Sequence, residues 1–359
     1  MTVPPQFFKR DVIITCGTGG VGKTTLSAAM GIRAALEGRR VCVITIDPAK
    51  RLATSLGMKE LDSDPQDLTE KLRASASAQG FTLPEKASFH ALMPDTRSTF
   101  EEFFKRLTSS SVVLDQLIKN PLFQIFAREF SGTNEYMALQ QLMKLYDSGQ
   151  FDCIVLDTPP SRNTLDFLDA PKLLNQLFDA NIIQWLIRPA NKIAEATVKK
   201  ALGLLEKLTG ATFMHHMLEF ARGLFEIRTG FSKQLNRVIE LLSSDKTGVI
   251  LVTGAHADFA EELAHFRRHL LDHGLKLDAL FVNRTLGAYP ELSSQALTEA
   301  KMNPELSRAL ELIQSLRARE TQALSRLKHA TGDLPTTLMP ELARDIHSIE
   351  DLIYVARQI

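Results

Sequence analysis

The chain has 359 residues, of which 44% are hydrophobic and 23% are charged, a composition that is ordinary for a globular protein and argues against disorder. Its 42 basic and 42 acidic side chains give a formal net charge of zero, so no global field draws it to nucleic acid or to an anionic membrane. The sequence also lacks both a run of about 18 apolar residues and a signal-peptide core. We therefore expect a soluble, cytoplasmic protein that does not bind nucleic acid and does not insert stably into a membrane.

Short runs of apolar and β-branched residues recur along the chain and predict strands. In chain order they are 12–15, 41–46, 89–93, 153–156, 249–252, 280–282 and 336–339. Segments with a 3.6-residue period lie between them and predict helices, most clearly 24–37, 259–273 and 304–330. Nearly all the strands are apolar at both alternating positions, which is typical of a parallel sheet covered by helices. The pattern predicts an α/β fold with a doubly wound, mainly parallel sheet of about seven or eight strands.

Between residues 171 and 245 the strand rhythm stops, and the sequence reads as several amphipathic helices. We expect one domain over residues 1–359 with a helical subdomain, 171–245, inserted within it. Stripes of apolar residues on such helices usually pack in a core, but they also suit an adaptable groove for a hydrophobic client. The positions for which both interpretations stay open include Leu177, Trp185, Leu186, Met214, Met217, Leu218 and Phe225.

The first predicted strand is followed by a segment that satisfies the pattern G-x-x-x-x-G-K-[ST] in full. It reads Gly17-Thr18-Gly19-Gly20-Val21-Gly22-Lys23-Thr24-Thr25. The glycines let the backbone curl so that N–H groups point at phosphate oxygens, and the following helix adds its N-terminal dipole. We expect Lys23 to reach the β- and γ-phosphates of ATP and the Thr24 hydroxyl to bind Mg²⁺. The segment predicts a P-loop with nucleotide-binding residues 19–25.

Two aspartates follow predicted strands at positions where catalytic carboxylates are found in P-loop proteins. Asp157 ends the strand 153–156, where it would hold Mg²⁺ through water, although an aspartate there can also cap the next helix. Asp47 follows the strand 41–46, where its carboxylate would orient the attacking water or accept its proton. Taken alone, the second motif leaves this catalytic role and a helix cap equally open.

The P-loop, Asp47-Pro48-Ala49 and Asp157-Thr158-Pro159-Pro160 together resemble the ArsA family of anion-transporting ATPases. That family includes the eukaryotic ATPase that targets tail-anchored membrane proteins, and it is related to MinD, ParA and the nitrogenase iron protein. The resemblance implies that Asp47 positions water and that Asp157 begins a second switch. It also implies that the Asn283 amide reads the adenine edge and that Pro340 flanks the base.

The chain departs from this family in two respects. The family usually carries a lysine at the second P-loop position that reaches the partner's nucleotide across a dimer, but here the residue is Thr18. Lys50, Arg51 or Arg162 would be candidates for a substitute cation. In addition, the three cysteines are isolated from one another in sequence, which argues against the thiol cluster of arsenite pumps and against a Cys-x-x-Cys zinc site. Their positions in predicted strands indicate buried, reduced thiols.

The resemblance implies a Mg²⁺-dependent enzyme that converts ATP and water to ADP and phosphate and thereby drives a conformational switch. It also implies a homodimer, or a heterodimer with a paralogue, that handles a hydrophobic or membrane-protein client. Two alternatives are a MinD- or ParA-like positioning factor and a P-loop phosphotransferase. A basic membrane helix or DNA-binding stripe would favour the former, and an acceptor pocket in place of the apolar insertion would favour the latter. The sequence does not define the client.

Overall fold

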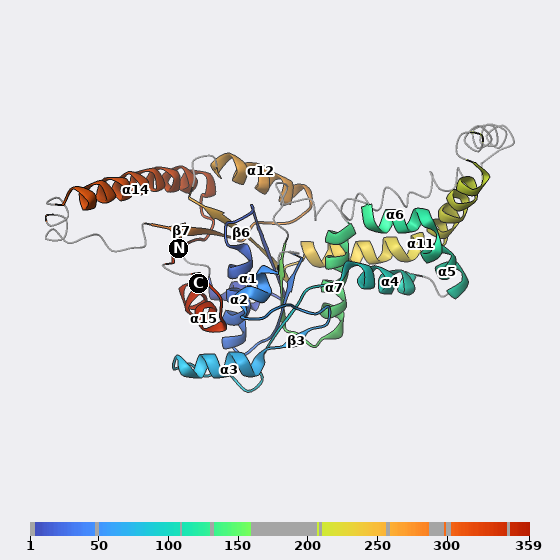
Figure 1. The fold of residues 1–359 in the computed structure, drawn as a ribbon, viewed down its shortest axis with the longest axis horizontal. Coiled ribbons are helices and arrows are strands. Elements are labelled where there is room, and N and C mark those ends of the chain that lie inside the picture. The colour runs from blue at the N-terminus through green and yellow to red at the C-terminus, as the bar shows by residue number, and fades with distance from the viewer. Residues whose placement is uncertain are drawn as a thin grey trace. The chain divides into compact units, whose positions relative to one another are not determined.

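The computed structural model describes residues 4–46, 50–107, 110–129, 133–158, 210–255, 259–286, 303–342 and 345–359, together with positions 207 and 298 (Figure 1). The contacts of the chain divide it into two compact units. The first comprises Met1–Met93, Ser148–Leu165 and Ser243–Ile359, and the second comprises Pro94–Asp147 and Asp166–Leu242. The chain therefore leaves the first unit twice and returns to it twice.

The first unit contains a sheet of eight strands among the described residues, in the order β3-β4-β2-β5-β1-β6-β7-β8. The strands are β1 (Val12–Gly17), β2 (Arg40–Thr45), β3 (Gln66–Asp67), β4 (Ser88–Leu92), β5 (Cys153–Asp157), β6 (Thr247–Gly254), β7 (Ala279–Thr285) and β8 (Thr336–Pro340). Every neighbouring pair is parallel except β3 with β4. This arrangement confirms the predicted α/β fold with a mainly parallel sheet. Only β3 was absent from the sequence prediction, because two residues form no apolar run.

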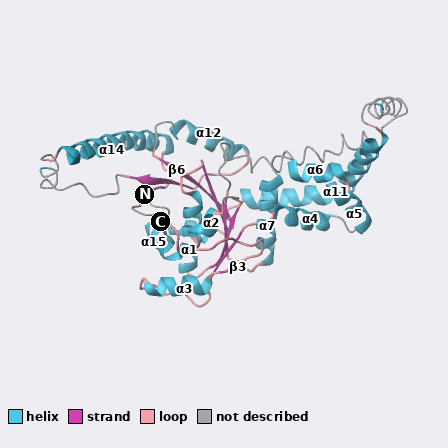
Figure 2. Cartoon of the chain, in the orientation of Figure 1, coloured by secondary structure: helices cyan, strands magenta, loops and turns pink. Residues whose placement is uncertain are grey.

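Helices cover the sheet of the first unit (Figure 2). They are η1 (Pro5–Lys9), α1 (Lys23–Leu36), α2 (Arg51–Ser55), α3 (Thr69–Ala78), α12 (Phe259–Asp272), α14 (Pro304–Thr331) and α15 (Ile349–Gln358). One hydrophobic core joins the sheet to α1 and α15 and includes Ile13, Phe89 and Leu352. Helix α1 approaches the sheet closely, since a Cβ on Gly31 would lie 2.7 Å from Cγ2 of Val43. The middle of this helix is thus packed closely against β2.

The second unit contains helices among its described residues. They are α4 (Thr96–Leu107), α5 (Ser111–Lys119), α6 (Pro121–Glu129), α7 (Thr133–Ser148) and α11 (Ala211–Ser243). Aromatic side chains from four of these helices meet edge to face in its core, with the ring of Phe103 5.4 Å from that of Tyr136 and 5.8 Å from that of Phe231. Helix α11 is the described part of the predicted subdomain 171–245, and residues 171–206 lie outside the described ranges. Among the described helices, none combines the length and apolar character needed to cross a membrane.

Arg39 ties the N-terminal segment to the sheet. Its guanidinium donates to the backbone oxygens of Phe8 and Asp152, and to that of Arg10 at 2.6 Å. The side chain is mostly buried, with 17% of its surface exposed. A single cation therefore satisfies carbonyl groups from η1, from the residue that follows η1 and from the residue that precedes β5.

Replacing Arg39 by alanine is expected to lower the free energy of unfolding by about 2 kcal/mol or more, because part-buried carbonyl groups lose charge-assisted donors. Urea denaturation measures the change. Arg33→Ala is the matched control, since Arg33 forms an exposed helical ion pair with Glu37 at 2.9 Å and such pairs contribute about 0.5 kcal/mol or less. Equal losses in the two variants would show that the Arg39 network has no special role.

Candidate functional site

The glycine-rich loop, residues 17–25, connects the end of β1 to the start of α1. Two of its glycines occupy positions that no larger residue fits. A Cβ on Gly17 would lie 2.2 Å from the carbonyl oxygen of Val252 in the neighbouring strand β6. Gly22 has a φ of 88°, in the left-handed region, and a Cβ there would lie 2.3 Å from Nδ2 of Asn283. The loop therefore bends tightly into the N-terminus of α1, the geometry that binds phosphate groups.

Lys23 is the first residue of α1, and its side chain folds back along the glycine-rich loop. Its Nζ donates a hydrogen bond of 2.8 Å to the backbone oxygen of Gly17 and lies 3.5 Å from that of Thr18. Only 5% of the residue is exposed. A buried ammonium held on carbonyl dipoles is a fixed positive charge, so an anion is favoured beside it.

Asp157 ends β5, and its carboxylate is completely buried. Oδ1 accepts a hydrogen bond of 3.1 Å from Ser27, and Oδ2 accepts one of 2.9 Å from Thr45. The Thr24 side chain donates to the same carboxylate. Burial raises the pKa of Asp157 to about 6, although these hydrogen bonds and the charge of Lys23 act in the opposite direction.

The oxygen atoms of Thr24 and Asp157 form a donor set that fits Mg²⁺. One hydroxyl and one carboxylate are hard ligands, and Mg²⁺ characteristically takes one or two carboxylates and completes its shell with water and phosphate. The two groups come from the start of α1 and the end of β5 and are hydrogen-bonded to each other. These two groups are therefore chemically suited to hold Mg²⁺.

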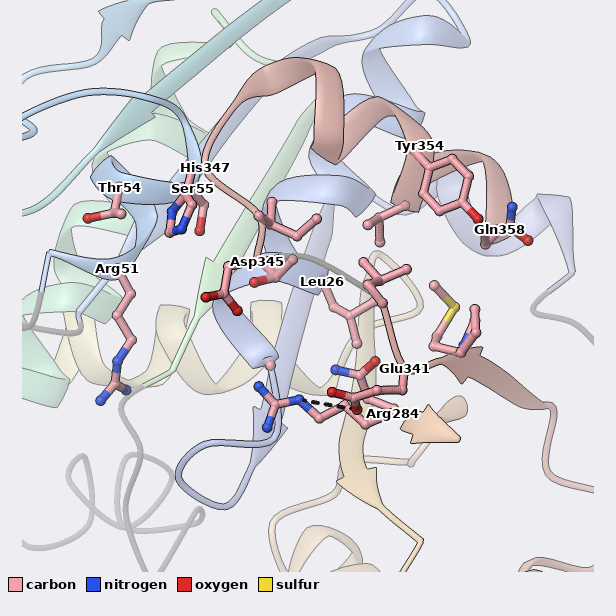
Figure 3. Close-up of a pocket in the computed structure, with 18 residues that line it drawn as sticks. Leu26, Arg51, Thr54, Ser55, Arg284, Glu341, Asp345, His347, Tyr354 and Gln358 are labelled. Atoms are coloured by element: carbon pink, nitrogen blue, oxygen red, sulfur yellow. Dashed lines mark ion pairs between the residues drawn. The ribbon is translucent and has the colours of Figure 1, made fainter. Parts of the chain in front are cut away.

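A cavity of about 300 Å³ lies beside the start of α1 and is called here the base-side cavity (Figure 3). Its lining includes Gly22 and Thr25 from the glycine-rich loop, Asn283 from β7 and Pro340 from β8. Nδ2 of Asn283 donates a hydrogen bond of 2.8 Å to the backbone oxygen of Val21. This bond ties the asparagine to the loop and leaves the amide oxygen as an acceptor for a ligand. The cavity is thus lined both by the polar amide of Asn283 and by residues of the glycine-rich loop.

The remaining lining of the base-side cavity carries charges that the sequence analysis did not single out. Arg284 and Glu341 form an ion pair of 3.8 Å between the ends of β7 and β8 (Figure 3). Asp345 and His347 also line the cavity. These residues come from the segment after β8, which has no recognisable motif in the sequence.

The structure brings the predicted residues together in two groups. Lys23 and Thr24 lie with Asp157, whereas Asn283 and Pro340 share the base-side cavity with Thr25. Asp47 lies outside the described residues. The hydroxyls of Ser27 and Thr45 were not predicted as site residues, although each occurs in a recognisable place: one turn after Lys23 and at the end of β2.

The candidate substitute cations have different surroundings. Lys50 forms an ion pair of 3.2 Å with Glu60 and is exposed. Arg51 lines the base-side cavity (Figure 3). Arg162 lies outside the described residues.

The sequence model of the family described as "Anion-transporting ATPase" matches residues 10–357, which is nearly the whole chain. The chain belongs to this family. A relative from Chlorobaculum tepidum, named for an arsenical pump-driving ATPase, is 26% identical over 280 residues, which are 77% of this chain and 62% of the relative. ATPase GET3B of Arabidopsis thaliana is 26% identical over 348 residues, which are 93% of this chain and 77% of the relative.

Other relatives share shorter parts of the family sequence. ATPase GET3 of Malassezia globosa is 29% identical over 160 residues, which are 45% of this chain and 42% of the relative. The match covers 62% of the Chlorobaculum tepidum relative and 63% of the putative arsenical pump-driving ATPase 1 of Aquifex aeolicus. The chain thus spans about three fifths of the length of these curated relatives.

The cysteines of this family member are enclosed in the sheet. Cys16, Cys42 and Cys153 are all buried and form no disulfide. Burial raises the pKa of Cys16 and Cys153 to about 12 and also raises that of Cys42. Since the thiolate is the reactive and metal-binding form, these three thiols behave as core side chains.

Thr45→Val is expected to lower the free energy of unfolding by about 1–3 kcal/mol, because the variant keeps the side-chain shape but removes a hydrogen-bond donor to a buried carboxylate. Chemical denaturation at neutral pH measures the effect. Thr321→Val is the matched control, since that exposed hydroxyl donates only to the backbone oxygen of Arg317 in α14. An unchanged stability for Thr45→Val would contradict the role given to this hydroxyl.

Proposed function

We propose that this chain binds MgATP and hydrolyses it to ADP and phosphate. The observation that carries the proposal is the pairing of a glycine-rich loop and its buried Lys23 with the buried carboxylate of Asp157. Membership of the anion-transporting ATPase family supports it. Thr24 and Asp157 would hold Mg²⁺, which when bound neutralises negative charge on the phosphates.

The protein's own groups account for phosphate binding and orientation. The N-terminal backbone amides of α1 and the ammonium of Lys23 would bind the β- and γ-phosphates. The base would occupy the base-side cavity, between Asn283 and Pro340. Because Asn283 is hydrogen-bonded to Val21, the residues that would bind the base are directly connected to the loop that would bind the phosphates.

Asp47 remains our candidate for positioning the attacking water. Its place in the chain supports this role, since Thr45 at the end of β2 is aligned with Asp157 and donates to it. The N–H of Ile46 also donates to the backbone oxygen of Asp157, at 3.3 Å. The chain therefore passes directly beside the proposed magnesium ligand before it reaches Asp47. Asp47 is the next residue in the chain, and this proximity in sequence supports its proposed role as a general base.

Lys23→Ala is expected to abolish nucleotide binding or turnover, whereas Asp47→Asn should leave MgATP binding within a few-fold and slow hydrolysis by roughly 100-fold or more. Calorimetric binding and a phosphate-release assay separate the two effects. Asp64→Asn is the matched control because Asp64 lies outside both groups of site residues. Wild-type turnover of Asp47→Asn at saturating MgATP would remove Asp47 from the catalytic role.

We further propose that hydrolysis drives a conformational switch in a cytoplasmic dimer and that the helical subdomain handles a hydrophobic client. Two of the relatives described above carry the GET3 name, and the second unit supplies amphipathic helices for such a role. Among the apolar positions singled out in α11, Met214 is buried, so it serves the core of the second unit. Met217 and Leu218 are only half-buried and are the better candidates for client contact.

Hydrogen exchange across α11 should differ between the ADP state and a state with a hydrolysis-resistant ATP analogue if this helix follows the nucleotide. Met217→Asp should then reduce capture of a hydrophobic probe peptide while leaving ATP turnover intact. Met214→Asp is the contrasting variant, because a charge at a buried position should unfold the second unit. Identical exchange in both nucleotide states would count against the switch.

A further inference from the structure

A second cavity, the α14 cavity, lies between the glycine-rich loop and helix α14. Loop residues 18–21 line it, together with the ends of β6 and β7 and the α14 side chains Arg319, Gln322 and Arg326. Its volume is about 710 Å³. Asn283 and Arg284 line this cavity and the base-side cavity alike, so the two adjoin at the end of β7. The function proposed above makes no use of the α14 side chains.

Helix α14 is held in place beside the end of β7. Glu320 is buried, and its Oε2 accepts a hydrogen bond of 2.7 Å from the N–H of Leu286, directly after that strand. Arg267 of α12 donates to the backbone oxygens of Ala330 and Thr331 at 3.3 and 3.4 Å, near the C-terminal end of α14. The helix is therefore held at two places, at the residue after β7 and at α12, and the face that carries Glu320 lies next to the end of β7.

The residues at 319, 322 and 326 follow one another at helical spacing and share one face of α14. Three arginines and one glutamate line the α14 cavity. Arg284 already faces Glu341 at 3.8 Å, and Glu320 is bonded to the backbone. Arg319 and Arg326 form no ion pair with any acidic group of the residues that the structure describes. Both side chains are exposed to solvent, and among the described residues they give the cavity an excess of positive charge, which favours an anionic ligand.

We propose that Arg319 and Arg326 bind phosphoryl oxygens at the glycine-rich loop, as a second cationic contact in addition to Lys23. This inference rests on the proposed function. Thr18 places a hydroxyl and no charge on the wall that faces the arginines, so Lys23 is the only cation of the loop itself. Phosphoryl transfer depends on positive charge around the phosphate, and a guanidinium supplied from the same chain is an established solution in P-loop enzymes.

Two ligands with the same chemistry could supply the phosphoryl oxygens that the arginines bind. These oxygens belong either to the bound nucleotide or to inorganic phosphate that leaves after hydrolysis. Both are oxyanions that a planar guanidinium binds through paired hydrogen bonds. Binding experiments with the two ligands separate the sources.

The test is the double variant Arg319→Ala/Arg326→Ala. Calorimetry measures its affinity for a magnesium complex of a hydrolysis-resistant ATP analogue, and separately for inorganic phosphate in the presence of saturating ADP. We expect at least one of the two dissociation constants to rise about tenfold or more, since each arginine contributes charge-assisted hydrogen bonds. Arg308→Ala is the matched control, because it is an exposed arginine of the same helix outside the cavity, and it should change neither constant.

The ligand that loses affinity identifies the source. Dissociation constants for both ligands within twofold of wild type would overturn the proposal. The conservative pair Arg319→Lys/Arg326→Lys keeps the charge and should recover part of the loss, whereas Arg319→Gln/Arg326→Gln should not. These pairs preserve helical side chains, so they decide the question if the alanine pair unfolds. If the wild-type chain bound no MgATP at all, that result would instead contradict the proposed function itself.

Discussion

A carboxylate enclosed at the centre of a parallel sheet is the constraint on which the site depends. Asp157 has no access to water, and a buried carboxylate is tolerated only where donors or cations surround it. Its donors come from β2 and α1, and Thr15 of β1 extends the network by a contact of 2.6 Å with the hydroxyl of Ser27. Helix α1 must therefore begin beside the end of β5, and this position fixes the glycine-rich loop between them.

On the side of the loop that contacts β7, the arrangement of residues depends on backbone geometry rather than on charge. The pairing of β7 with β8 is irregular after Val282, and Arg284 has a φ of 59°. An irregularity of this kind re-aims the side chains at a strand end, and here it accompanies the approach of Asn283 to the loop. The pairing resumes between Thr285 and Pro340, and the Thr285 hydroxyl donates to the backbone oxygen of Met339 at 3.0 Å. The irregularity in β7, the glycine-rich loop and the base-side cavity are thus connected through Asn283.

The sequence alone predicted the structural features that depend on contiguous residues. Apolar runs indicated the seven longer strands, and the glycine-rich motif located the loop. It missed what depends on distant partners: Ser27 is 130 positions from Asp157, and Glu320 is 34 from Leu286. An ordinary serine in a helix and a glutamate among other charges give no local signal. The arginines of α14 resemble any solvated helix face until the fold places them opposite the loop.

Gly17 lies against the carbonyl oxygen of Val252 in β6, so the shape of the loop depends on a strand that is synthesised later than β1. β1 emerges from the ribosome before β6, one of its two neighbours, and β6 follows only after both segments of the second unit have been made. Until then the central strand has an open edge, which is a site for wrong pairing, and the loop lacks its supporting wall. A nascent chain would consequently acquire its phosphate-binding shape late, and chaperones that shield strand edges would matter most during that interval.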